Sequence, residues 1–170
     1  HRFEEIRTLF WRNSKLNFNT PISLIKSLEE KPQVEWLRKI HECEDEKALK
    51  YFLKDQKILN RGFDKKTLML LWECCQIPDF VKKTYGNHFE VIGNVFKFLT
   101  SKKGLISEDY MRLQLMKLDK LDGNVDSLSN RIANVRTWSY VSNKNNWVEN
   151  QSYWIEKTKH LEDRLSDRLH

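Results

Sequence analysis

The sequence is poor in the residues that mark several specialised classes of protein. Its 170 residues include three cysteines, three prolines and five glycines. An odd, unspaced set of cysteines does not indicate a disulfide framework, and the prolines and glycines punctuate the chain without forming a linker. Every apolar run is interrupted by charge before 18 residues, so we expect no membrane span. The start lacks the pattern of a signal peptide, and an intracellular protein is the simplest interpretation.

Motifs for nucleotide hydrolysis are also missing. A motor needs a G-x-x-x-x-G-K-[ST] loop, because backbone amides, a lysine and a hydroxyl must converge on the phosphates and magnesium. The acidic run Glu44-Asp45-Glu46 is followed by Lys47-Ala48, so it does not resemble the metal-holding D-E-x-H motif of helicases. We expect this run to be a solvated first helical turn, where acids complement the helix dipole. No cofactor is therefore expected in this chain.

Signals for other catalytic or metal sites are weak. Asp163 and Asp167 could act as paired carboxylates, and His41 with Cys43 as base and nucleophile, but no oxyanion loop accompanies either pair. A zinc site that adds Cys74-Cys75 to His41 and Cys43 lacks C-x-x-C or H-x-x-x-H spacing. We predict neither a catalytic residue nor a metal ligand, and reduced, buried thiols fit the cysteines better.

The composition instead indicates a folded, mildly basic domain. Hydrophobic residues make up 39% of the chain, with six tryptophans and nine phenylalanines, which argues against disorder. Charged residues make up 32%, and the net charge is +6. A chain of this length buries roughly 68 to 70% of its unfolded surface, so a substantial core is expected.

Helix signals dominate, and strand signals are nearly absent. Thr20, Asp64 and Ser107 each stand before an apolar period as helix-capping residues. Val34, Leu37 and Ile40 are expected to continue a helical period. The sequence predicts an all-α fold, an irregular bundle of roughly seven to nine helices.

The expected organisation is a connector followed by one helical region. Residues 1–20 are assigned to a connector from a preceding domain and residues 21–170 to the helical region, with a subdomain joint near 55–65. The face formed by Leu68, Leu71, Trp72 and Cys75 is predicted to be central core.

Two helices predicted in the last third carry the most informative pattern. At about 100° per residue, the first helix has an apolar stripe flanked by Arg131 with Trp138 on one edge and Arg136 with Tyr140 on the other. In the second helix, Arg164 flanks the apolar stripe, while Asp163 and Asp167 point away from it. The two apolar stripes comprise Leu128, Ile132, Val135 and Ser139, and Trp154, Thr158, Leu161, Leu165 and Leu169.

These runs, with several others, resemble the region that follows the second motor domain in the mitochondrial degradosome RNA helicase family, especially its alphaproteobacterial members. Residues 81–110 match only in pattern, and the chain favours Lys and Asn where those relatives favour Arg and Ala. The matching segments are His1-Arg2-Phe3, Trp11-Arg12-Asn13, Leu71–Phe80, Leu118-Asp119, Asp122–Asp126, Asn130–Val141 and Glu162–His170.

The resemblance implies an accessory region of an ATP-dependent RNA helicase. Such a region packs against two RecA-like motor domains and helps to close the channel for single-stranded RNA, while the motor supplies ATP and magnesium. It implies a bacterial cytoplasmic or mitochondrial matrix location, and a chain that continues beyond Leu169-His170.

The residues themselves offer candidate contacts with RNA. Arginine can hold phosphate bidentately and aromatic rings can stack on unpaired bases. The candidates are Arg131, Arg136, Trp138, Tyr140 and Lys144. The alternative is structural, with the aromatic rings in the core and the arginines paired to Glu162, Asp163 or Asp167.

A protein partner is the second functional hypothesis. Asp163, Arg164 and Asp167 are candidates for docking to the motor or to another protein. An adaptor that binds a ribonuclease through exposed helical faces, without contacting RNA, is the alternative to RNA binding.

Overall fold

The computed structural model describes residues 9–55, 58, 63–81 and 85–170. The chain is 60% helical, and the described residues form seven helices and one two-stranded sheet. The all-α, multi-helix fold predicted from the sequence is thus confirmed, with the small sheet as an addition.

Two compact units make up the chain, residues 1–76 and residues 77–170. The subdomain joint expected near 55–65 lies within the first unit, and residues 56–57 and 59–62 there are outside the described residues, as are residues 1–8 of the expected connector.

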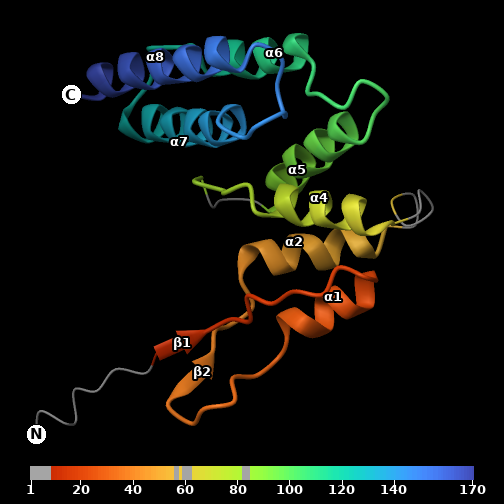
Figure 1. The fold of residues 1–170 in the computed structure, drawn as a ribbon. Helices are drawn as coiled ribbons and strands as arrows, with labels where there is room; N and C mark the ends of the chain where they lie inside the picture. The colour runs from red at the N-terminus through yellow and green to blue at the C-terminus, as the bar shows by residue number, and fades with distance from the viewer. Residues whose placement is uncertain (1–8, 56–57, 59–62, 82–84) are drawn as a thin grey trace, which may run out of the picture. The chain divides into compact units, whose positions relative to one another are not determined.

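The first unit contains two short strands and three helices among its described residues (Figure 1). Each of its helices is preceded by a capping residue with extended backbone geometry. The elements are β1 (Leu9–Trp11), α1 (Pro21–Leu28), β2 (Leu37–Lys39), α2 (Glu44–Leu53) and α4 (Lys65–Cys75).

Local capping explains where α1 and α4 begin. The Thr20 hydroxyl accepts the Ser23 backbone N–H at 3.0 Å, the Ser23 hydroxyl accepts the Thr20 N–H at 2.9 Å, and Pro21 occupies the first helical position. The Asp64 carboxylate likewise accepts the Thr67 N–H at 2.7 Å. Both caps match the positions predicted from the sequence.

The helical period expected through Val34, Leu37 and Ile40 is wrong. Leu37–Lys39 is strand β2, which pairs in parallel with β1 and sets Leu37 opposite Leu9. The Ile40 N–H extends the pairing by donating to the Trp11 carbonyl at 2.9 Å. Parallel strands require a crossover connection, which the segment containing α1 supplies. This pairing joins residues far apart in sequence, so the local period gave no sign of it.

The core of the first unit lies between α2 and α4. Leu49 and Leu71 are both fully buried, and Trp72 is nearly so. The four residues predicted as central core, Leu68, Leu71, Trp72 and Cys75, are all buried. Helix α4 contacts α2, which buries Ala48, Leu49 and Phe52.

A partly buried ionic cluster connects the segment after β1 to the start of α2. Arg12 donates to both oxygens of Asp45, at 2.7 and 3.1 Å, and to Glu46 at 3.3 Å. Its guanidinium also lies 5.5 Å from the centre of the Trp72 ring. The hydrogen bond to Asp45 raises the pKa of Arg12, so the cation is favoured. The expectation of a solvated acidic turn holds for exposed Glu44 but is wrong for Glu46, which is buried under Arg12.

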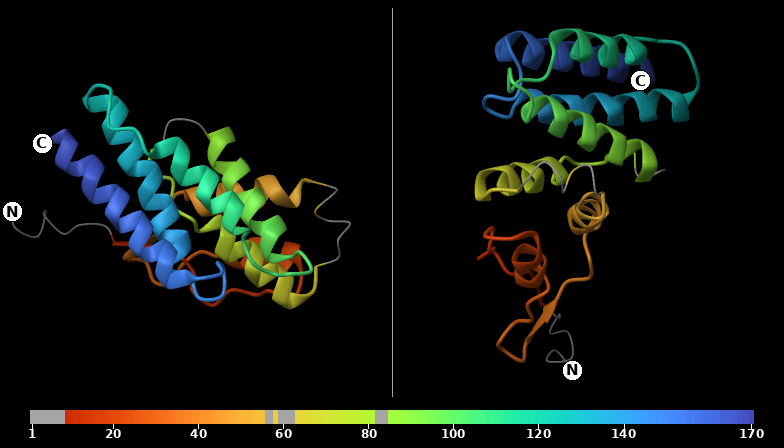
Figure 2. Two further views of the ribbon diagram at one scale, coloured as in Figure 1. Left: turned by 90° about the horizontal axis from the view of Figure 1, so that it is seen from above. Right: turned by 90° about the vertical axis from the view of Figure 1, so that its right-hand side faces the viewer.

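The second unit consists of four helices and their connections in the described residues. Figures 1 and 2 show α7 and α8 running side by side, with α6 against the same pair. The helices are α5 (Tyr85–Leu99), α6 (Glu108–Leu118), α7 (Val125–Ser142) and α8 (Gln151–Leu169).

The apolar stripes of α7 and α8 form the core of this unit. Val135 and Leu165 are fully inaccessible to solvent, and Trp154 is 1% exposed. Thr158 is buried within the same stripe because its hydroxyl donates to the Trp154 carbonyl at 2.9 Å. In the segment between the two helices, the Trp147 carbonyl accepts a hydrogen bond of 2.8 Å from the Ile106 backbone N–H.

Replacing Leu165 with alanine is expected to lower the free energy of unfolding by about 2–5 kcal/mol. The substitution leaves a cavity in the fully buried seam, the contact between the apolar stripes of α7 and α8. Leu113→Ala is the matched control. Because Leu113 is 50% exposed, its replacement should lower the free energy of unfolding by under about 1 kcal/mol. Chemical denaturation followed by circular dichroism measures both. Equal losses would contradict the seam as the core of the unit.

Candidate nucleic-acid interface

Arg131 is committed to the turn between α6 and α7. Its Nη1 donates to the backbone carbonyl of Lys120 at 2.7 Å and to that of Asp122. Gly123 allows this turn with a φ of 107°, and a Cβ at that position would lie 3.3 Å from Arg131 Nη2. The arginine therefore clamps the end of one helix to the start of the next.

Trp138 lies in the core of the second unit. It is 4% exposed and meets the Tyr110 ring edge-on, with centroids 5.7 Å apart. The ring of Tyr110 also packs against that of Phe98, with centroids 5.1 Å apart. This aromatic cluster packs α5, α6 and α7 together, so the Trp138 ring is not presented to solvent.

The remaining candidates on and after α7 are more accessible. Arg136 is exposed and its Nε lies 3.5 Å from a carboxylate oxygen of Glu162, which links α7 to α8. Half-buried Tyr140 and buried Trp147 share one cation, because Lys144 Nζ lies 5.9 and 5.3 Å from their ring centres. The structure thus brings Tyr140 and Lys144 together and separates them from Arg131.

The three docking candidates on α8 divide between two surfaces. Asp163 and Asp167 are exposed, as their position opposite the apolar stripe predicted. Arg164 instead faces α6, where it forms an ion pair with Asp119 just after the end of that helix.

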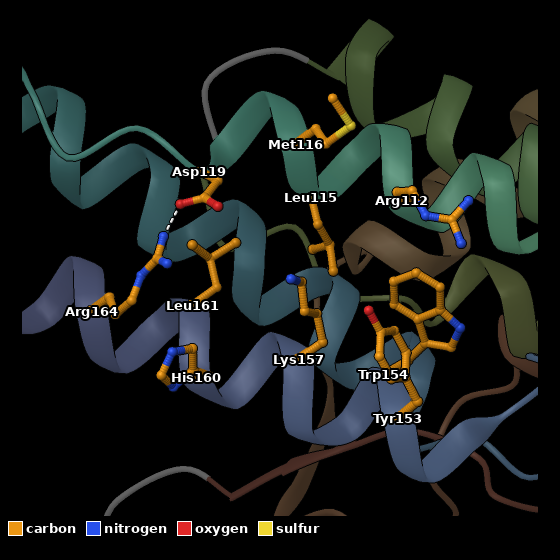
Figure 3. Close-up of a pocket in the computed structure, with 10 residues that line it drawn as sticks. All are labelled: Arg112, Leu115, Met116, Asp119, Tyr153, Trp154, Lys157, His160, Leu161 and Arg164. Atoms are coloured by element: carbon orange, nitrogen blue, oxygen red, sulfur yellow. Dashed lines mark hydrogen bonds and ion pairs between the residues drawn. The ribbon is translucent and has the colours of Figure 1, made fainter.

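Arg164 belongs to a pocket between α6 and α8 that the sequence did not predict. The pocket has a volume of about 260 Å³. Figure 3 shows side chains from both helices around it, with Lys157 extending from α8 toward α6. The lining residues are Arg112, Leu115, Met116, Asp119, Tyr153, Trp154, Lys157, His160, Leu161 and Arg164.

The α8 side of this pocket is a cationic and aromatic stripe. Tyr153, Lys157, His160 and Arg164 follow at helical intervals and share one face beside the buried apolar stripe. Arg112 contributes a further cation from α6 and pairs with Asp109 of the same helix at 2.8 Å. The helical spacing of the α8 residues is visible in the sequence. Their position across from Arg112 of α6 depends on the tertiary structure, which the spacing does not show.

Two buried N–H groups in the pocket lining donate to no group in the described part of the chain. They are Nε1 of Trp154 and Nε of Arg164. Unpartnered donors in buried positions are costly and uncommon in native proteins. The lining residues therefore include two that carry an unpartnered donor and one acidic side chain, Asp119.

In the first unit, one group of side chains has the composition of a metal site. Ligand atoms of Cys43, Asp45 and Glu46 all lie within 4.8 Å of one another. Arg12 already binds both carboxylates and supplies the positive charge that a metal would bring. Burial raises the pKa of the Cys43 thiol, which disfavours the thiolate that a metal requires.

Comparison with known proteins adds no further constraint. No protein-family model matches the chain, and neither a curated protein nor a solved structure matches it. Among the described residues, no helix has the length and apolar character needed to cross a membrane.

Substitution of Arg131 with alanine should lower the free energy of unfolding by about 1–2 kcal/mol, because two backbone carbonyls lose a charged donor. Arg136→Ala should cost under about 1 kcal/mol, since its ion pair is exposed. Denaturant titrations separate the two. If Arg131→Ala left stability unchanged and weakened RNA binding, the assignment of Arg131 to the turn would be wrong.

The thiols should differ in reactivity. Burial raises the pKa of Cys75 well above its ordinary value, and Cys74 is fully buried, whereas Cys43 is half-buried. Iodoacetamide at pH 8 should therefore label Cys43 first and the other two only on unfolding, as mass spectrometry of digests can measure. A Cys43→Ser variant should stay nearly unlabelled while folded, and rapid labelling of Cys75 in that variant would contradict its burial.

Proposed function

We propose that this chain is an accessory region of an ATP-dependent RNA helicase and that its second unit contacts single-stranded RNA through the surface between α6 and α8. In this proposal the region packs on the RecA-like motor domains, which bind ATP and magnesium and perform the hydrolysis. The compartment would be the bacterial cytoplasm or the mitochondrial matrix.

The observation that carries RNA contact is the pocket between α6 and α8. Arg112, Lys157 and Arg164 supply positive charge, and Tyr153 is 52% exposed at the same place. Cations that follow a phosphate backbone and an accessible ring that stacks on a base are the two elements of sequence-tolerant binding to single strands. Of the candidates on and after α7, exposed Arg136 and the pair of Tyr140 and Lys144 could extend this surface.

The resemblance to the degradosome helicases carries the assignment to a motor protein. Asp163 and Asp167 form an exposed acidic edge on α8, next to the cationic stripe. This edge is suited to a basic surface of the motor, because docking there would leave the pocket side of α8 open to RNA.

The alternative of a protein adaptor has a specific observation in its favour. Leu113 is 50% exposed and Met116 is 63% exposed on α6. Exposed apolar side chains on one helix suit a helix-in-groove contact, whose affinity depends less on salt than that of a phosphate contact.

The test is fluorescence anisotropy of a labelled single-stranded RNA with the 170-residue chain at several salt concentrations. The variant combines Arg112→Gln with Lys157→Gln, and the matched control combines Lys117→Gln with Lys159→Gln. Both pairs take one exposed cation from α6 and one from α8, but the control cations lie outside the pocket lining.

Loss of two phosphate contacts should weaken binding and reduce the slope of log K against log salt by about 1.4, from roughly 0.7 per contact on single strands. The control should keep most of the slope. Equal losses in both variants would indicate diffuse attraction by net charge. An absence of binding by the folded chain at low salt would overturn RNA contact and favour the adaptor.

A further inference from the structure

We infer that the pocket between α6 and α8 is a site for a phosphate group, and that the Asp119 carboxylate occupies the place of that phosphate when the site is empty of ligand. This inference rests on the proposed function, because it specifies what the same surface binds. The ligand chemistry is a phosphate group, supplied either by an RNA strand or by a free mononucleotide.

The hydrogen bonding of Arg164 points to an acceptor larger than a single carboxylate oxygen. Its Nη2 donates to Asp119 Oδ1, while its Nε, on the same edge of the guanidinium, is buried and has no partner in the described residues. Arginine binds phosphate with two parallel donors of this kind. A phosphate in the place of the carboxylate can accept from both Nε and Nη2.

Asp119 has no evident structural reason to be acidic apart from this pair. It stands immediately after α6, where a negative charge opposes the helix dipole. Its side chain and that of Arg164 are 41% and 38% exposed, so the pair is accessible to water. Exposed ion pairs contribute little to stability, and an incoming anion can compete with the carboxylate.

The charge of the pocket favours that exchange. The lining contains the cations Arg112, Lys157 and Arg164 and the single acid Asp119, and His160 stands between the two α8 cations. When Asp119 leaves Arg164, a phosphate can gain that guanidinium, and the Lys157 ammonium of the same lining adds positive charge (Figure 3).

A ring at the edge of the pocket suits a further base of a bound strand. Tyr153 is half-exposed and is held edge-on by buried Trp154, with ring centres 4.8 Å apart. Such a fixed and accessible ring offers a stacking face at little entropic cost. Tyr153 and Arg164 stand eleven residues, about three helical turns, apart on α8, so a base on Tyr153 belongs to another nucleotide of the strand than the phosphate at Arg164.

The decisive variant is Asp119→Asn, compared with Asp163→Asn. Each removes one exposed negative charge, which is next to Arg164 in space for Asp119 and in sequence for Asp163, but Asp163 lies outside the pocket lining. Binding of labelled oligoadenylate is measured by anisotropy, and adenosine monophosphate is titrated while the melting temperature is recorded. Circular dichroism verifies folding.

Removing the competing charge should tighten binding of both probes by about threefold to fivefold, the equivalent of roughly 1 kcal/mol for an exposed pair. Asp163→Asn should change affinity by less than about twofold. Adding Arg164→Lys to Asp119→Asn should abolish the gain, because lysine keeps the charge but lacks the fork. Tyr153→Ala, at an exposed position, tests the base site without disturbing the ion pair.

The outcomes separate this inference from the proposed function. If the wild-type chain binds oligoadenylate but Asp119→Asn and Asp163→Asn behave alike, RNA contact stands and the exchange of Asp119 for phosphate is overturned. If oligoadenylate does not bind but adenosine monophosphate binds more tightly to Asp119→Asn, the phosphate site stands and the RNA function fails. A gain that survives Arg164→Lys would also overturn the inference.

Discussion

The seam between α7 and α8 determines the chemistry of the second unit's surface. Burial of Trp154, Leu161 and Leu165 against α7 fixes the rotation of α8 about its own axis. Once that rotation is set, the neighbouring stripe that includes Lys157 and Arg164 must face the space beside α6. The polar pocket is thus a geometric consequence of an apolar contact, and a change in the seam would move the cations as well.

Sequence patterns predicted those parts of the fold that depend on local interactions. The caps at Thr20, Asp64 and Ser107 each satisfy a backbone N–H within three residues, so their signals lie in the sequence itself. Strand β2 is different, because the pairing of Leu37 with Leu9 requires the chain to return across α1. A three-residue strand has no period long enough to outweigh a helical one.

The candidate site was predictable in its residue types more than in their roles. The arginines and aromatic residues of α7 were correctly seen as chemically capable, but the acceptors of Arg131 are carbonyls nine and eleven residues earlier in the chain. Trp138 is buried by Tyr110, which belongs to another helix. The pocket combines α6 with α8, and no spacing within either helix indicates the other.

The Arg12 cluster also has a consequence for the order of folding. Arg12 and Asp45 are 33 residues apart, so the first unit must close a long loop before its ionic contacts form. The α7–α8 seam needs only the short connection of residues 143–150 to close. Local contacts of this kind form faster. The lower entropic cost of loop closure thus favours earlier folding of the second unit when the whole chain refolds. During synthesis, by contrast, the first unit emerges earlier, because the chain is made from its N-terminus.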